Sequence, residues 1–354
     1  MVLRKAQHGV SIADEHDSER IAAYCRELGP AHGLALEVVL PAERARLADV
    51  RRWDGFLFVG ADDFVRTFIE QQEGRVPVFL WAKGYDLTID ARWPRALAAV
   101  RLFFNSSYLS AVEDRHNDRT QYLPTAFHGE WPWTLSGWLG NLRNGVVDLD
   151  VFDLVFSGSD RHVRSDRYRQ RLLNVLARRG MKVCVAAPPS AWNRPHRETG
   201  SVDTGLDRAV HLLGNWGSES IFRRARCILD LPWLDNVFHD HPAHHDPNRS
   251  IFALGWNIFR AGAWGARLLT YDCPANRDLG LSDEHCLFYH SDISDVDALA
   301  DEIVAQVGVS RGVVDWSPKQ AALRGLFHER HTYRVRWAHI CRELQRHYGR
   351  EAAA

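Results

Sequence analysis

The sequence has no long apolar run and no excess of charge of one sign. Its longest apolar stretches, such as 56–61 and 76–82, are far shorter than the roughly 20 residues of a membrane-spanning helix. Lys and Arg number 44 against 45 Asp and Glu, a formal net charge of −1, so the molecule as a whole does not attract polyanions. We expect no membrane span, and a nucleic-acid partner is possible but not favoured, because it would need a local basic patch.

Cysteine pairs and a leader segment are also missing. No two of the six cysteines are separated by two residues, the spacing typical of zinc and redox motifs. Residues 1–17 lack the basic and apolar segments of a secretory signal. These absences predict free, buried thiols and a cytoplasmic protein.

What the sequence does contain is a regular alternation of short apolar segments with helical patterns, which is typical of βα units and parallel sheets. Strands are predicted at 36–40, 55–59, 76–81, 100–104, 121–123, 154–157, 182–186, 209–213, 227–231, 267–271 and 286–289, with 9–12 left open. Helices are predicted at 18–28, 42–50, 64–72, 107–115, 165–179, 218–224, 251–262, 296–307, 318–328 and 332–348. The last helix places Tyr333, Trp337, Ile340 and Leu344 on one face, which predicts a core stripe.

The pattern stops between 124 and 150, where Gly, Pro, Trp and Asn predominate, as in a linker between domains. With 354 residues, two domains are the economical interpretation. The predicted fold is α/β, with two doubly wound Rossmann-like domains facing a cleft. We expect domains at 1–145 and 146–330, and a C-terminal helix at 331–354 that packs back toward the first domain.

A short loop of small residues follows the first strand of the second series. In Phe156-Ser157-Gly158-Ser159, backbone amides could approach a bound anion at the start of the next helix. The three-glycine dinucleotide fingerprint and the Gly-Lys-Ser/Thr phosphate loop are both absent. A turn of this kind equally well joins a strand to a helix without binding anything.

Three segments, in this order, resemble the CgeB-like (spore-maturation) glycosyltransferases, which have the two-domain GT-B architecture. They are the strand and loop at 156–159, the small-residue helix and strand at 257–270, and the His-Thr-Tyr-x-x-Arg helix start at 331–336. The resemblance implies a nucleotide sugar, most simply a UDP-sugar, held by the second domain. It also implies an acceptor glycan, protein or small molecule held by the first domain, and hexosyl or pentosyl transfer in the cleft with neither cofactor nor metal.

A metal-free site must stabilise the leaving diphosphate with helix N-termini, backbone amides and cationic side chains. Arg167 and Arg169 are further cations in the same helix as Arg164, although arginine on a helix is more often solvated. Our candidate donor-binding residues are Gly158, Ser159, Arg164, Asn215, Trp216, Asn257 and Arg260.

One of these residues departs from the resembling group, in which the corresponding helix carries Glu at the place of Arg260. That Glu would accept hydrogen bonds from ribose hydroxyls, whereas a guanidinium has no acceptor and suits a phosphate. Three interpretations follow: the donor sits differently, catalysis has been lost, or Arg260 makes an ion pair on the helix surface.

A general base for the acceptor hydroxyl would come from the first domain, and the candidates are Asp62, Asp86 and His128. Each could instead cap a helix or stabilise a turn, and a retaining enzyme needs no such base. The His and Asp cluster at 239–246 could hold a metal, but Pro242 and Pro247 favour a surface loop. Two other functions stay open: a catalytically inactive nucleotide- or sugar-binding protein, and a nucleic-acid-modifying sugar transferase that uses the arginines between 161 and 179.

Overall fold

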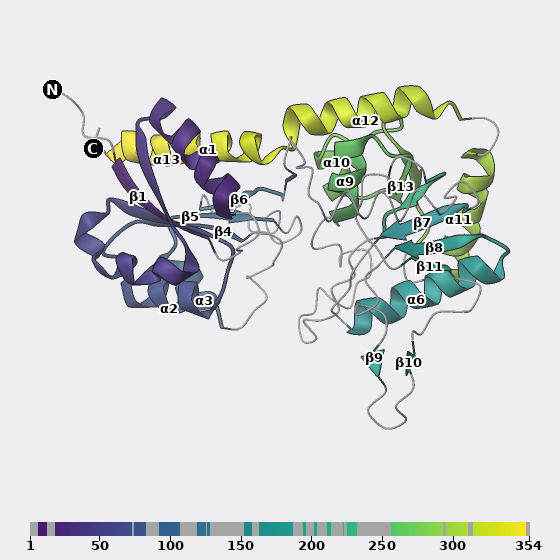
Figure 1. Ribbon diagram of the computed structural model, residues 1–354, viewed down its shortest axis with the longest axis horizontal. Coiled ribbons are helices and arrows are strands. Elements are labelled where there is room, and N and C mark those ends of the chain that lie inside the picture. Colours follow the sequence, from purple (N-terminus) through teal and green to yellow (C-terminus); the bar gives the residue numbers. More distant parts are fainter. Residues whose placement is uncertain are drawn as a thin grey trace. The chain divides into compact units, whose positions relative to one another are not determined.

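The computed structural model describes residues 6–12, 18–72, 74–82, 92–106, 119–124, 126–127, 152–157, 163–186, 194–195, 202–203, 211–213, 222, 225–231, 256–292, 295–310 and 314–351. The chain divides into two compact units (Figure 1). Unit 1 comprises Met1–His128 with Thr332–Ala354, and unit 2 comprises Gly129–His331. The domain boundary predicted at 145 lies outside the described residues.

Unit 1 is built on a six-stranded parallel sheet in the order β2-β1-β3-β4-β5-β6. Its strands are β1 (Ala6–Ile12), β2 (Leu34–Val39), β3 (Gly55–Val59), β4 (Val78–Ala82), β5 (Leu102–Asn105) and β6 (Thr120–Tyr122). The strand that the sequence left open is β1, which lies inside the sheet between β2 and β3. Its sequence AQHGVSI carries polar residues and a glycine, so its apolar pattern is weak.

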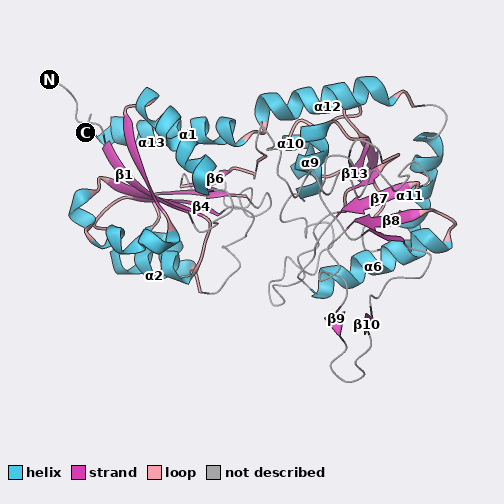
Figure 2. Ribbon diagram, viewed as in Figure 1, coloured by secondary structure: helices cyan, strands magenta, loops and turns pink. Residues whose placement is uncertain are grey.

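Helices cover both faces of this sheet (Figure 2). They are α1 (Ser18–Ala31), α2 (Asp63–Gln72), α3 (Pro94–Ala99) and α13 (Tyr333–Glu351). One core lies with α1 and α13 and includes Trp81 and Trp337, and the other lies with α2 and α3 and includes Phe56 and Phe68. The predicted stripe on the last helix is confirmed, because Tyr333, Trp337, Ile340 and Leu344 are all buried.

The helix predicted at 42–50 is wrong in type. The segment forms two 3₁₀ helices, η2 (Pro41–Ala48) and η3 (Val50–Arg52). They are separated at Asp49, whose φ of −82° and ψ of 77° are not helical. The short helix α3 was not predicted, and the helix predicted at 107–115 lies outside the described residues.

Unit 2 contains a second parallel sheet in the order β11-β8-β7-β12-β13-β14. Its strands are β7 (Leu154–Ser157), β8 (Val183–Ala186), β11 (His211–Leu213), β12 (Ile228–Leu229), β13 (Leu268–Tyr271) and β14 (Leu287–Tyr289). All six overlap predicted strands. A two-stranded antiparallel ribbon of β9 (Arg194–Pro195) and β10 (Val202–Asp203) was not predicted. Two separate parallel sheets confirm the predicted α/β fold class.

The helices of unit 2 pack in pairs, α6 (Val163–Arg178) beside α11 (Val296–Ser310) and α9 (Trp256–Trp264) beside α12 (Trp316–Arg330). A shorter helix, α10 (Pro274–Asp278), follows β13. We expected the small residues of 257–270 to allow close packing against a ligand or the sheet. They allow close packing against α12 instead, since a Cβ at Gly262 would lie 2.1 Å from the ring of Phe327. The helix predicted at 218–224 lies outside the described residues except for Phe222.

Candidate functional site

Both sheets have a point at which the strand order reverses direction. In unit 1 it lies between β1 and β3, and in unit 2 between β7 and β12. In open parallel sheets, ligands bind beyond the carboxyl ends of the strands at such points. The residues that follow β3 and β12 are therefore the first candidates among those described.

In unit 2, Asp230 follows β12 directly and is only 3% exposed. Its Oδ2 accepts a hydrogen bond from Thr270 Oγ1 in the neighbouring strand β13, at 3.0 Å. Thr270 Oγ1 in turn accepts from Asn276 Nδ2 of α10, also at 3.0 Å. Tyr289 at the end of β14 donates its hydroxyl to the main-chain oxygen of Asp230 at 2.7 Å. Strands β12, β13 and β14 and helix α10 thus converge on one buried carboxylate.

Burial dominates the electrostatics of this carboxylate. It raises the pKa of Asp230 from 3.8 to about 7, while the hydrogen bond from Thr270 and the charge of Arg169 act in the opposite direction. The physical cause is that the charged form loses its hydration when it is removed from water. A carboxyl group that titrates near neutrality at a sheet switch point is a functional-site candidate.

Two oxygens of the network, Asp230 Oδ1 and Asn276 Oδ1, are buried and have no hydrogen-bond partner in the described part of the chain. The orientation of the Asn276 amide is fixed, because its Nδ2 also donates to Tyr271 O at 2.7 Å. Asn276 Oδ1 is an acceptor, and Asp230 Oδ1 is an acceptor when the carboxyl is ionised. The site therefore offers lone pairs to a group that carries hydrogen-bond donors.

Two arginines of unit 2 have limited contact with bulk water. Arg169 of α6 is 8% exposed, with its Cζ 5.6 Å from the centre of the Phe156 ring at the end of β7. Arg260 of α9 is partly buried, and burial lowers its pKa to about 10, so it remains a cation at neutral pH. Arg169 is therefore not a solvated helix-surface arginine, while for Arg260 an ion pair on the helix stays an alternative.

The other predicted donor residues are placed only in part. Asn257 is buried in the first turn of α9. Arg164 belongs to α6, but its side chain is not among those described. The remaining four, Gly158, Ser159, Asn215 and Trp216, lie outside the described residues.

In unit 1, Asp62 lies beyond the carboxyl end of β3, immediately before α2. Its Oδ1 accepts the backbone N–H of Val65 at 2.8 Å, and its Oδ2 accepts from Arg44 Nη2 at 2.6 Å. This is the geometry of a helix cap, one of the two roles weighed for this residue. A role as catalytic base stays a prediction, and Asp86 and His128 lie outside the described residues.

The outer strands of unit 2 carry a second polar cluster at the same carboxyl edge. Asp272 follows β13 and accepts from Arg277 through Nε at 2.6 Å and Nη2 at 2.8 Å. His290 follows β14, with its Nδ1 3.2 Å from Asp272 Oδ2. The hydrogen bond from Arg277 lowers the pKa of Asp272. These groups bond to one another and stabilise the strand ends. Among the described residues that follow β12, β13 and β14, Asp230 is the buried carboxylate with an unsatisfied oxygen.

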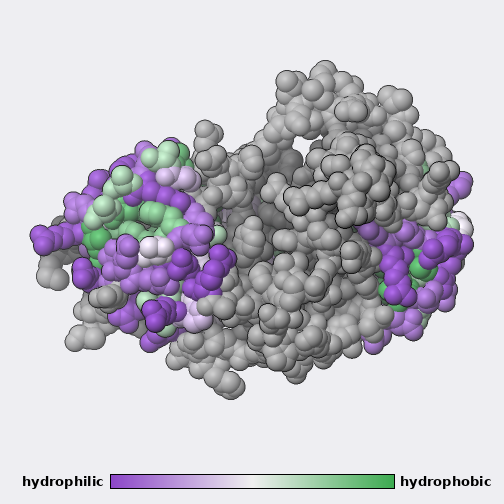
Figure 3. All heavy atoms as spheres, turned by 90° about the horizontal axis from the view of Figure 1, so that it is seen from below, coloured by the Kyte–Doolittle hydropathy of each residue, from purple (hydrophilic) through white to green (hydrophobic). Residues whose placement is uncertain are grey.

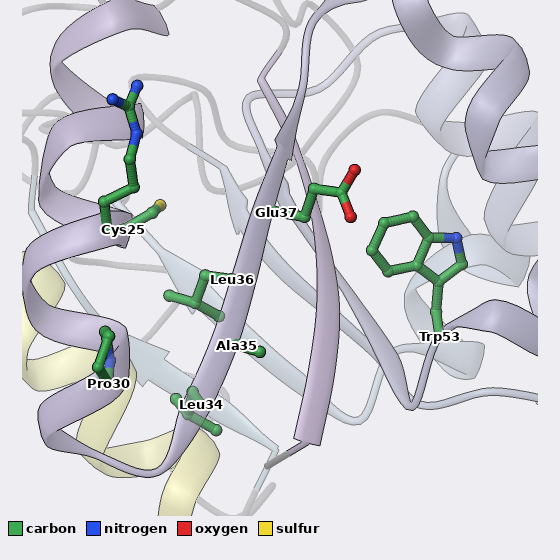
Figure 4. A pocket seen from close by; sticks show the side chains of 8 residues that line it. Cys25, Pro30, Leu34, Ala35, Leu36, Glu37 and Trp53 are labelled. Atoms are coloured by element: carbon green, nitrogen blue, oxygen red, sulfur yellow. The ribbon is translucent and has the colours of Figure 1, made fainter.

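A pocket of about 260 Å³ in unit 1 contains none of the predicted site residues. It lies along the edge strand β2, between α1 and Trp53 (Figure 4).

The described surface in the view of Figure 3 is mainly hydrophilic, and within the described residues Leu40 is the only large apolar side chain that is exposed. Neither the pocket beside β2 nor the exposed Leu40 contributes a residue to the candidate site at the carboxyl ends of the strands.

No three His, Cys, Asp or Glu side chains of the described residues form a group that could hold a metal ion, and the 239–246 cluster lies outside this part of the chain. No helix among those described is long and apolar enough to cross a membrane.

Sequence reasoning named the arginines but missed the Asp230 network. Residue 230 was placed inside a predicted strand at 227–231, although the acidic side chain that ends an apolar run was a signal that the strand had finished. Thr270 and Asn276 carry no such signal, because their role depends on strand pairing and on the short helix α10.

No protein-family model matches the sequence, and no curated protein is significantly similar to it. Solved structures match over nearly the whole chain. Sucrose-phosphate synthase from Thermosynechococcus elongatus has a TM-score of 0.61 at 11% identity, covering 98% of this chain and 100% of its own.

Two further structures agree with this match. HepE of Anabaena in complex with UDP gives a TM-score of 0.58 at 10% identity, covering 96% of this chain and 99% of its own. A glycosyltransferase from Rickettsia africae gives 0.59 at 9% identity, covering 96% and 98%. The chain therefore has the GT-B fold.

Proposed function

We propose that this protein is a glycosyltransferase that moves a sugar from a nucleotide-sugar donor to an acceptor. The fold alone does not fix an activity. Support comes from proteins of the same fold, among them HepE, which has been solved with UDP and with UDP-glucose. The observation that carries the proposal is the buried Asp230 network, which lies at the switch point of the unit 2 sheet.

The chemistry at this edge of the sheet matches the two halves of a nucleotide sugar. Asp230 and Asn276 offer free acceptor oxygens, which suit hydroxyl and N–H groups. Arg169 and Arg260 are cations with restricted access to water, which suit a diphosphate because guanidinium groups bind phosphate oxygens in pairs. Unit 2 is accordingly the donor-binding unit in this proposal.

In the reaction, the bond between the anomeric carbon of the sugar and the diphosphate oxygen breaks, and the nucleoside diphosphate leaves with the electron pair. An acceptor oxygen forms the new bond and loses its proton. We assign the developing negative charge to the arginines of unit 2 and, for an inverting reaction, the proton to Asp62 in unit 1. The donor is a UDP-sugar that delivers a hexosyl or pentosyl group without a divalent metal.

The closer relation to the CgeB-like group is part of this proposal and is supported by the order of the segments at 156–159, 257–270 and 331–336. The acceptor is a glycan, a protein or a small molecule. A cytoplasmic location is supported by the six cysteines, which are all free and buried, since disulfides are rare in reducing compartments.

Calorimetry of the full chain with UDP in the presence of EDTA tests the donor site directly. We expect binding that is unchanged when Mg²⁺ or Mn²⁺ replaces the chelator. ADP and inorganic phosphate are the controls for nucleotide recognition. A complete absence of binding to UDP, UDP-glucose and other nucleotide sugars would contradict the proposal, and strict dependence on a metal would contradict its metal-free form.

Arg260 supports a second candidate function, a GT-B protein that binds a nucleotide or a sugar without transferring it. A guanidinium replaces the carboxylate found in the resembling group and cannot accept a ribose hydrogen bond. Release of UDP from a UDP-sugar, measured with and without a panel of acceptors, separates the two functions. Binding without any release under all acceptor conditions favours the binding protein.

A further inference from the structure

The Asp230 network has a direction. Asn276 Nδ2 donates to Thr270 Oγ1 at 3.0 Å, and Thr270 Oγ1 donates to Asp230 Oδ2 at 3.0 Å. Each donor in this short chain is used within the protein. What remains at its end is Asp230 Oδ1, an acceptor with no partner within the described residues.

A buried acceptor without a partner is costly, and such groups usually have a bound water or a ligand as the missing partner. Asp230 is 3% exposed, so bulk solvent does not supply that partner. The position of the residue favours a ligand over a water, because Asp230 follows β12 at the switch point, where parallel sheets bind their ligands. An acceptor repels phosphate oxygens, so this part of the site suits the nucleoside half of the donor.

We propose, on the basis of the function proposed above, that Asp230 is a donor-binding residue whose free oxygen accepts a hydrogen bond from a hydroxyl or N–H group of the nucleoside. In the resembling group, a Glu on the helix that corresponds to α9 accepts hydrogen bonds from the ribose, and this chain carries Arg260 at that place. Asp230, which follows β12, would supply the acceptor that Arg260 cannot. Cation and carboxylate have thus separate partners: Arg260 binds the diphosphate and Asp230 binds the nucleoside.

The test compares UDP affinity in two matched variants, D230N and D153N. Asp153 is also 3% exposed and belongs to the same sheet, but it precedes β7 at the amino end and accepts the backbone N–H of Lys182 at 3.0 Å. Asparagine keeps the size of the side chain and one acceptor oxygen in both. A hydrogen bond to a charged group corresponds to a loss of about tenfold to a hundredfold in affinity when it is removed.

We expect D230N to weaken UDP binding by at least about tenfold and D153N to leave it unchanged, with both variants folded by circular dichroism. If wild type binds UDP and D230N binds it equally well, Asp230 binds only water and this inference is overturned, while the proposed function stands. If D153N weakens binding as much as D230N, the effect is structural and the inference is likewise overturned. If wild type binds no nucleotide, the proposed function itself fails.

A ligand series then identifies the group that Asp230 contacts. 2′-Deoxy-UDP and 3′-deoxy-UDP each lack one of the two ribose hydroxyls, and N3-methyl-UDP lacks the only N–H of the base. The analogue that lacks the contacted group should bind wild type more weakly than UDP does, and D230N should not distinguish it from UDP. If D230N discriminates among the four ligands as wild type does, no hydroxyl or N–H group of the nucleoside contacts Asp230 and the assignment is wrong.

Discussion

The pKa of Asp230 predicts how the stability of unit 2 changes with pH. Burial raises this pKa from 3.8 to about 7 in the folded protein, so the folded state binds the proton more tightly than the unfolded state does. The stabilisation that results is complete below pH 3.8 and is lost as the pH rises through 7. For these two values, the proton-binding equilibria give a loss of about 2–3 kcal/mol between pH 5 and pH 8.

The variant D230N isolates this contribution, because its amide does not titrate. We expect the free energy of unfolding of wild type, relative to D230N, to fall by about 2–3 kcal/mol from pH 5 to pH 8. Urea denaturation of the full chain can be monitored by hydrogen exchange in peptides that contain β12 and β13. This readout reports on the unfolding of unit 2 specifically. Parallel pH profiles for wild type and D230N would refute the reasoning.

The variant T270V checks the cause of the shift. Thr270 donates to Asp230 Oδ2 and thereby favours the ionised carboxylate. Valine has the same shape but no hydroxyl, so the pKa of Asp230 should rise further, and the loss of stability should extend to higher pH. A T270V profile that shifts toward lower pH would show that another group controls the titration.

Three further predictions concern other parts of the molecule. Replacing Arg260 by Ala should weaken UDP binding by about tenfold or more in calorimetry, and an unchanged affinity would remove it from the donor site. Replacing Gly262 by Ala should lower the unfolding free energy by about 1–3 kcal/mol, because the new methyl group would meet the Phe327 ring; Gly325→Ala in α12 is the control, and with open space around it it should raise thermal stability slightly. Replacing Asp62 by Asn should preserve the free energy of unfolding within about 1 kcal/mol, since Asn also caps helices. It should reduce turnover about a hundredfold if Asp62 is the base; unchanged turnover would show that Asp62 acts only as a helix cap.

Much of the sheet architecture could be predicted because buried parallel strands form short, almost purely apolar runs. Gly55–Val59 and Leu154–Ser157 were predicted with the bounds that the structure shows. Of strand β1 only the segment at 9–12 was considered, and it remained open because it is short and contains Gly9 and a polar residue. Its strand is specified by pairing with β2 and β3 on both sides, a tertiary effect that no local pattern contains.

The candidate site was less predictable, because it depends on which atoms remain unsatisfied. The position of Arg260 could be found by its difference from the resembling group. The importance of Asp230 could not, since its chemistry comes from burial and from Thr270 and Asn276, which lie 40 and 46 positions further along the chain. Asp62 shows the opposite case, in which a residue conspicuous in the sequence is explained by a local cap and an ion pair with Arg44.

The exchange of charge on α9 therefore need not abolish donor binding. A nucleotide sugar presents acceptors at its diphosphate and donors at its ribose and base, so a site needs cations for one half and carboxylates or amide oxygens for the other. With Arg260 on α9 in place of a Glu, that helix no longer supplies an acceptor for the nucleoside. Another element must therefore supply one. Strand β12 meets that requirement with Asp230, because a sheet switch point brings neighbouring strand ends together whatever their side chains are. The backbone topology thus allows the cation that binds the diphosphate and the acceptor that binds the nucleoside to come from different elements than in the resembling group. The donor should bind as long as Arg260 and Asp230 are both present.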